Sequence, residues 1–182
     1  MAGSLVQVDT YTVSTAAASI IIGGGSASSS GIDFAINTDD VYMLTYTNWQ
    51  GSVNDKYPYM RLTESGTPNT GSSYQYAGLK LKTYSSFQQG YAYNQAQARL
   101  TDEKVGDQDQ ETCNGVMYFY NANNSSEYTF WTTNNVNRDG GGNLMSLTGA
   151  GHFRVTSAVD GIQLYMESGN IVSGTFTLYR EV

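Results

Sequence analysis

The amino-acid sequence predicts an all-β protein, an antiparallel β-sandwich of the jelly-roll kind that folds as a single domain. Three observations carry this prediction. Apolar side chains recur at every second position in many short segments, which is the spacing of half-buried strands. No segment of three helical turns carries apolar residues at helical spacing. The 182 residues include 20 glycines and 15 tyrosines but only 14% charged residues, which suits short strands joined by tight turns.

The clearest strand pattern lies at the C-terminus, where residues 156–182 read TSAVDGIQLYMESGNIVSGTFTLYREV. Two alternating segments are separated by residues 167–170, which are rich in turn-forming residue types. The apolar faces of these two segments consist of Ile162, Leu164 and Met166, and of Phe176 and Leu178. We therefore expect a closing β-hairpin whose last strand completes a sheet.

The rest of the chain is expected to supply further strands, roughly nine to eleven in all. They are expected at residues 5–13, 19–22, 31–36, 41–49, 57–63, 73–84, 98–101, 116–120, 128–132 and 144–155. Residues 19–22 and 31–36 could form a hairpin around the loop GGGSASSSG. Residues 86–112 lack a clear period, and we expect a long crossing loop there with one short strand near residue 98. Residues 1–15 are assigned to an N-terminal arm, and residues 16–182 to the sandwich domain.

Two segments, residues 41–49 and 73–84, carry apolar side chains on both faces, with Trp49 predicted on the same face as Met43. A two-sheet sandwich covers only one face of each sheet, so another surface should cover part of the outer faces. Identical neighbours around a closed axis are the simplest cover, so we expect a homo-oligomer.

The N-terminal arm carries alternating apolar residues without a core of its own, so we expect it to pair with a neighbouring chain by strand addition. Its candidate interface residues are Leu5, Val6, Val8 and Tyr11.

Few residues could carry catalysis. His152 is the one histidine and Cys113 the one cysteine, and neither belongs to a recognisable Ser/His/Asp or Cys/His motif. We interpret His152 as structural and Cys113 as an inert, half-buried thiol. A glycosidase with two paired carboxylates stays open, but no specific pair stands out. No catalytic residue is predicted, and we expect that the chain is not an enzyme.

Ligand-binding motifs are equally weak. Acidic residues alternate in residues 107–111 (DQDQE), but the glycine and the glutamate of a calcium-binding EF-hand loop are missing. We interpret this segment as a solvated acidic loop, and we expect no metal ion and no cofactor. Tyrosine and tryptophan faces can stack on sugars, but alternating aromatic residues are common in strands, and we place Trp49 and Trp131 in the core or an interface.

The charge pattern limits the possible partners. The net charge is −7, and the nine lysines and arginines are scattered along the chain, so no nucleic-acid partner is expected. No apolar run is long enough to span a bilayer, and no membrane partner is expected. A single cysteine excludes an intrachain disulfide, and no basic signal peptide is visible, which together favour folding in a reducing cytosol.

Residues 156–182 also resemble the C-terminal end of a group of bacteriophage virion structural proteins, in which an ending similar to TSAVDAIQFKMSSGNIDSGTIKLYGI follows a β-sandwich. The matching residues are Thr156, Ser157, Ala158, Val159, Asp160, Ile162, Gln163, Met166, Ser168, Gly169, Asn170, Ile171, Ser173, Gly174, Thr175, Leu178 and Tyr179. Looser similarity links Asp40–Leu44 to a DVYKF strand, Val116–Asn121 to ELFLFNP, and Leu100–Asp102 to LTDG. Arg180, Glu181 and the tyrosine-rich middle of the chain depart from the group.

The resemblance implies a non-enzymatic structural protein of a tailed phage, made in the host bacterial cytoplasm and mounted on the virion. Because virion proteins of this size often have threefold symmetry, the resemblance also implies that the expected homo-oligomer is a homotrimer. The leading expectation is a capsid decoration (cement) protein that binds the major capsid protein, or other virion proteins, where capsomers meet. The alternative is a tail or tail-fibre component that contacts glycans or receptors on the host surface. Copy number per virion separates the two.

Overall fold

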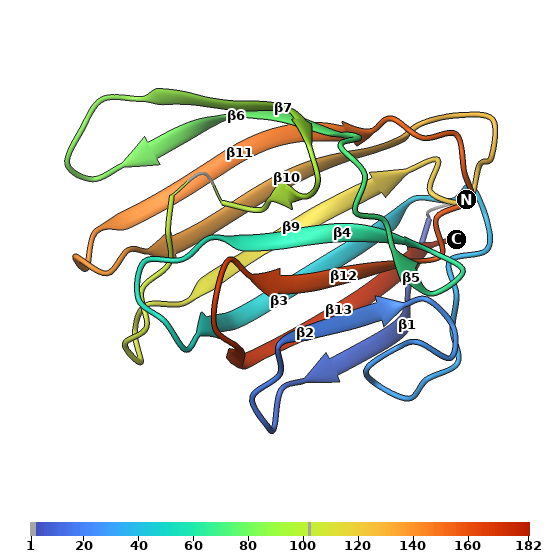
Figure 1. Cartoon of the computed structure of the whole chain (residues 1–182), viewed down its shortest axis with the longest axis horizontal. Helices are drawn as coiled ribbons and strands as arrows, with labels where there is room; N and C mark the ends of the chain where they lie inside the picture. The colour runs from blue at the N-terminus through green and yellow to red at the C-terminus, as the bar shows by residue number, and fades with distance from the viewer. Residues whose placement is uncertain (1–2, 102) are drawn as a thin grey trace.

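Thirteen strands and no helix are present in residues 3–101 and 103–182, the part of the chain described by this computed structural model (Figure 1). The strands form two antiparallel sheets that pack face to face, which confirms the predicted all-β sandwich. Their bounds are β1 Leu5–Thr12, β2 Ser19–Gly23, β3 Tyr42–Gly51, β4 Pro58–Glu64, β5 Thr67–Pro68, β6 Tyr74–Lys82, β7 Gln88–Gln95, β8 Ala98–Arg99, β9 Cys113–Tyr120, β10 Thr129–Arg138, β11 Leu144–Phe153, β12 Gly161–Met166 and β13 Ile171–Glu181.

Four strands of each sheet form a jelly roll. In the eight-stranded sheet β1, β13, β3 and β9 are neighbours in this order. In the facing sheet β2, β12 and β4 are neighbours, and the short β8 pairs with β4. The first strand thus lies beside the last, and the second beside the last but one, which is the nested arrangement of a jelly roll.

Strands β10, β11, β6 and β7 extend the eight-stranded sheet beyond the jelly roll, toward the top left of Figure 1. The inner face of this extension is covered by the loop after β8. Asn135 of β10 donates through Nδ2 to the carbonyl oxygen of Leu100 in this loop. Glu103 of the same loop forms ion pairs with Lys80 and Lys82 of β6. The predicted crossing loop therefore serves as part of the second layer, because it provides partners for polar groups that face inward.

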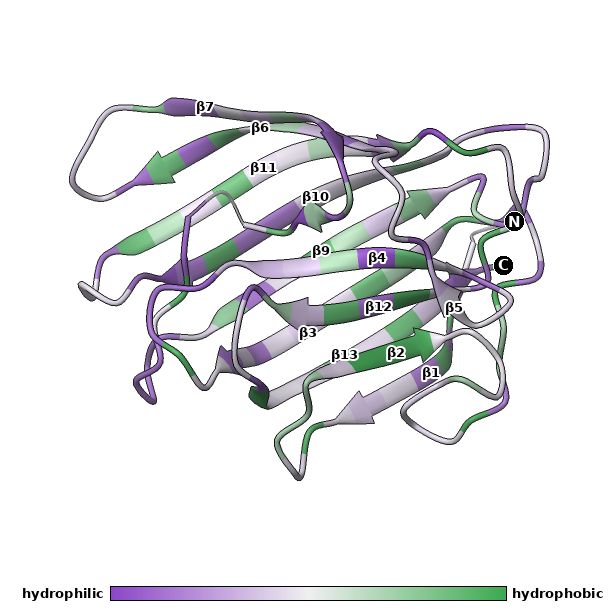
Figure 2. Cartoon of the chain, in the orientation of Figure 1, coloured by the Kyte–Doolittle hydropathy of each residue, from purple (hydrophilic) through white to green (hydrophobic). Residues whose placement is uncertain are grey.

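The hydrophobic core lies between the two sheets, and Figure 2 shows β2 and β12 as largely hydrophobic strands. Leu44 and Tyr46 of β3 face this core, as the alternation predicts. Asn48 has φ 53°, and the register shifts between Tyr46 and Trp49, so β3 contains a bulge here. The bulge reverses the alternation and turns Trp49 into the core, so its predicted position on the face of Met43 is wrong.

The two C-terminal strands do not form the predicted hairpin. β12 pairs with β2 and β4, whereas β13 pairs with β1 and β3 in the other sheet. Residues 167–170 carry the chain from one sheet to the other, with Gly169 at φ 77°. Both strands bury the predicted faces, because alternation indicates which side chains point inward. Alternation does not indicate which strand is the partner, and the hairpin prediction was wrong for that reason.

The described part of the predicted arm, residues 3–15, belongs largely to the sheet. Residues 5–12 form β1, which pairs along its length with β13 of the same chain. Val8 and Tyr11 pack against the core, and Val13 is buried. The segment is therefore an edge strand of the sandwich, with a core to pack on. Residues 1–2 lie outside the described part of the chain.

A buried carboxylate joins β1 to the loop after β2. Asp9 is only 1% exposed, and it accepts hydrogen bonds from Gly23 N, Ser28 Oγ and Ser30 Oγ at 2.7, 2.8 and 2.6 Å. Residues 31–36, predicted as the second strand of a hairpin, form only an isolated bridge between Gly25 and Phe34. The loop GGGSASSSG is therefore held by Asp9 and not by a returning strand.

Candidate binding site on the outer sheet face

The outer face of the eight-stranded sheet is uncharged across its middle rows, as far as the described residues reach. The register of the strands defines which side chains share this face. Its middle rows consist of Thr10, Thr12, Thr175, Thr177, Thr45, Thr47, Val116, Tyr118, Thr132, Asn134, Thr148, Ala150, Ala77, Leu79, Gln89 and Tyr91. A chain with a net charge of −7 thus presents one broad neutral surface.

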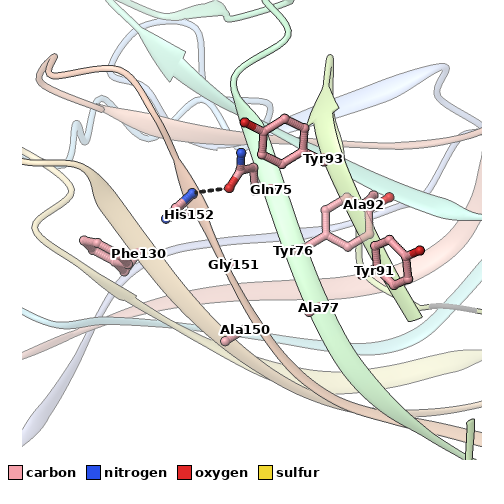
Figure 3. Close-up of a pocket in the computed structure, with 10 residues that line it drawn as sticks. All are labelled: Gln75, Tyr76, Ala77, Tyr91, Ala92, Tyr93, Phe130, Ala150, Gly151 and His152. Carbon is pink, nitrogen blue, oxygen red and sulfur yellow. Dashed lines mark hydrogen bonds between the residues drawn. The ribbon is translucent and has the colours of Figure 1, made fainter. Parts of the chain in front are cut away.

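A depression of about 430 Å³ lies on this face, over the extension of the sheet (Figure 3). Its floor includes Ala77 of β6 and Ala150 of β11. Phe130 of β10 stands on one side, and Tyr91 and Tyr93 of β7 stand on the other. The volume falls within the ~300–1,000 Å³ that is typical of small-molecule sites. We call these five residues, together with Gln75, Tyr76, Ala92, Gly151 and His152, the aromatic depression.

Small residues keep the floor open. Ala77 and Ala150 are direct partners across β6 and β11, and their short side chains leave room between the aromatic walls. Gly151 permits close packing beneath the floor, since a Cβ atom there would overlap the ring of Trp131. Trp131 is buried and supports the strand from the core side.

Two polar side chains meet at one end of the depression. His152 Nε2 and Gln75 Oε1 are 2.9 Å apart (Figure 3). Because a carbonyl oxygen accepts, Nε2 donates and Nδ1 of the imidazole is left as an acceptor. The amide nitrogen of Gln75 makes no hydrogen bond to another described residue. One donor and one acceptor are therefore available to a ligand.

The surroundings of His152 keep it neutral. Burial lowers its pKa from the ordinary value of 6.5, and the nearby positive charge of Arg154 lowers it further. The rings of Tyr128 and Phe130 approach the imidazole edge-on, with centroids 5.9 and 5.6 Å away. Arg154 itself lies over the ring of Tyr93 at 5.2 Å, outside the lining of the depression.

The aromatic walls are exposed to an unusual degree. Tyr91 is 82% exposed, Tyr93 62% and Phe130 42%. On the five-stranded sheet, by contrast, Arg99 lies 4.1 Å from the ring centre of Tyr57, and Arg61 covers Tyr165 in a similar way. Those rings are already in contact with guanidinium groups, whereas the ring of Tyr91 is open to solvent. The depression is therefore the stronger candidate for ligand stacking.

The residues predicted for an interface lie at the opposite edge of the sheet, on β1. Leu5 and Val6 are 51% and 46% exposed, whereas Val8 and Tyr11 are partly buried against the core. Only the first two thus offer an apolar surface to another chain. Their distance from β7, at the far end of the strand order, separates them from the aromatic depression.

The cysteine, the two tryptophans and the acidic loop are the other features that the sequence singled out. Cys113 is fully buried, not half-buried as expected, and burial raises the pKa of its thiol, which disfavours the nucleophilic thiolate. Trp49 and Trp131 lie in the core, one of the two placements expected, although Trp49 reaches it through the bulge in β3. In the acidic loop Asp109 is exposed, as expected, but Glu111 is buried and accepts a hydrogen bond from the backbone amide of Gln108 at 3.1 Å, so the loop is not solvated throughout.

Asp102, part of the LTDG resemblance, lies outside the described residues. Elsewhere in the described chain, no three His, Cys, Asp or Glu side chains are grouped to hold a metal ion. The described residues also contain no helix long and apolar enough to cross a membrane.

Strand β7 and its two tyrosines were not predicted from the sequence. The segment GYAYN alternates tyrosine with glycine and alanine, so it has a period of two, but its large residues point outward. This inversion, with small residues inward and aromatic residues outward, is the signal that could have indicated an exposed aromatic surface. Comparison of the chain with protein-family models, with curated proteins and with solved structures found no match.

Proposed function

We propose that this chain is a non-enzymatic structural protein of a tailed-bacteriophage virion, and that it serves as a capsid decoration protein where capsomers meet. The observation that carries the proposal is the similarity of residues 156–182 to the C-terminal end of virion structural proteins. These residues supply β12 and β13, which lie in the interior of the two sheets. The similarity therefore concerns the strands around which the fold is organised.

The open edge of β1 supports an attachment role. Among the described strands β1 pairs only with β13, so its other edge has no partner. Natural edge strands often carry lysine or proline, which discourages pairing with another chain. The sequence LVQVDTYT has neither, and it exposes Leu5 and Val6. We place the contact with the major capsid protein, or with another virion protein, at this edge by strand addition.

A homotrimer is the proposed assembly. The jelly-roll half of the outer face carries half-buried side chains such as Met43 and Tyr118, with no charge between them. Identical neighbours around a closed axis would cover this uncharged, threonine-rich surface without bringing like charges together. In this arrangement the aromatic depression, at the far edge of the sheet, stays accessible.

A tail or tail-fibre component that contacts the host surface is the second candidate, and the aromatic depression favours it. Exposed tyrosines on a rigid sheet suit recognition of a ligand outside the particle. This placement keeps the non-enzymatic role and changes only the position on the virion.

Copy number per particle tests the proposal. Purified virions of the phage that encodes the chain are analysed by quantitative mass spectrometry, with the major capsid protein as the internal reference. A decoration protein is expected in hundreds of copies, and a tail component in single or low double digits. Absence of the chain from purified virions would refute both placements.

A further inference from the structure

We propose that the aromatic depression binds a neutral carbohydrate, with aromatic side chains stacking on sugar rings and the Gln75 and His152 side chains bonding to hydroxyl groups. The inference rests on the side chains of the extension β10, β11, β6 and β7. It holds whether the chain lies on the head or the tail, and it does not depend on the virion assignment.

The walls and floor fit the shape of a sugar ring. A pyranose has faces formed by C–H groups and a rim of hydroxyl groups, and its C–H faces pack on aromatic rings. Phe130 on β10 and Tyr91 on β7 are separated by three strand spacings, about 14 Å. Between them the methyl groups of Ala77 and Ala150 form a low floor. This trough has room for a short oligosaccharide that contacts both walls.

The polar pair fits a hydroxyl group. A hydroxyl both donates and accepts, and the depression offers one of each kind of partner. The Gln75 amide nitrogen donates, and Nδ1 of His152 accepts while its Nε2 is engaged with Gln75 Oε1. A purely apolar ligand would leave both groups without partners after excluding water, which carries a free-energy penalty.

The absence of charge selects a neutral ligand. The ten residues that line the depression include no Asp, Glu, Lys or Arg. Sulfated or phosphorylated glycans are normally held by Arg or Lys, and cationic ligands by carboxylates. Arg154, the nearest cation, already contacts the Tyr93 ring and the side-chain oxygen of Asn94. Neither an anionic nor a cationic sugar finds a free partner in the lining.

The test uses the full chain on an array of immobilised neutral oligosaccharides, with heparin-derived oligosaccharides as the charged comparison. The strongest binder is then titrated by calorimetry. We expect a neutral oligosaccharide to bind with a Kd in the micromolar to millimolar range. Tyr91→Ala and Phe130→Ala should each weaken binding about tenfold or more, since each removes a stacking ring. Tyr91→Phe keeps the ring and should bind within about threefold of the wild type.

Tyr84→Ala is the matched control, because Tyr84 is another exposed tyrosine at the end of the β6–β7 hairpin, outside the depression. It should leave binding unchanged. All variants are checked by thermal melting, and because Tyr91 is exposed, its truncation is expected to leave the fold intact. Failure of the folded wild type to bind any neutral oligosaccharide on the array would overturn the proposal. So would preference for the sulfated ligands, or binding that Tyr91→Ala and Phe130→Ala leave intact. Self-association that Tyr91→Ala abolishes, without sugar binding, would assign the face to a second copy of the chain.

Discussion

At the scale of single residues, His152 shows how a side chain outside any motif gains a defined chemical state from its neighbours. The sequence indicated only one histidine in a strand, and a structural role was the reasonable prediction. In the fold its ring lies between Gln75 and two aromatic rings, beside the positive charge of Arg154. Gln75 and the two aromatic rings are distant from His152 in the sequence, and only Arg154 is a near neighbour. The alternation of apolar residues therefore could not indicate these contacts.

The pKa of His152 is the first prediction. Burial and the Arg154 charge favour the neutral imidazole, so the folded pKa lies below the ordinary value of 6.5. The unfolded chain then binds the proton more readily, and stability decreases as the pH falls from about 6.5 through the folded pKa. A proton NMR titration of the single histidine resonance measures this directly. Arg154→Gln should shift the pKa back toward 6.5, and a wild-type pKa at or above 6.5 would contradict the described surroundings.

At the scale of elements, alternation in the sequence placed several long strands and their buried faces, but β10 continues to Arg138, six residues beyond the predicted segment 128–132. Alternation correctly indicated which side chains of β12 and β13 point into the core, and it did the same for β3 as far as Tyr46. It failed where non-local geometry decides the outcome. The bulge at Asn48 reversed the face of Trp49, and the turn at residues 167–170 led to another sheet instead of a hairpin. β7 was missed because its large side chains face solvent, supported by contacts with β6 that no local pattern reveals.

The contact between β1 and the loop after β2 also could not be inferred from the local sequence. Asp9 is buried beside three donors from residues 23–30. We expect Asp9→Ala to lower the free energy of unfolding by about 2–4 kcal/mol, because it leaves buried donors without an acceptor. Urea unfolding followed by circular dichroism measures the change. Asp33→Ala is the control, since Asp33 is exposed in the same region. Equal stability of the two variants would show that Asp9 does not anchor the loop.

At the scale of the whole molecule, the strand order assigns different surfaces to different ends of the eight-stranded sheet. β1 forms one edge, with exposed Leu5 and Val6, and the β6–β7 hairpin forms the other, with the aromatic depression beside it. The jelly roll lies at the β1 end, and the extension lies at the β7 end. Attachment through β1 therefore leaves the depression free to meet a ligand, and the two proposed roles do not compete for one surface.

A density map of the virion that resolves side chains is the most direct test of this division of surfaces. We expect the chain in many copies on the head, with the open edge of β1 against a neighbouring virion protein and Tyr91 and Tyr93 facing solvent. A particle without this sandwich, or one in which the aromatic depression is buried under a neighbour while the β1 edge is free, would contradict the account.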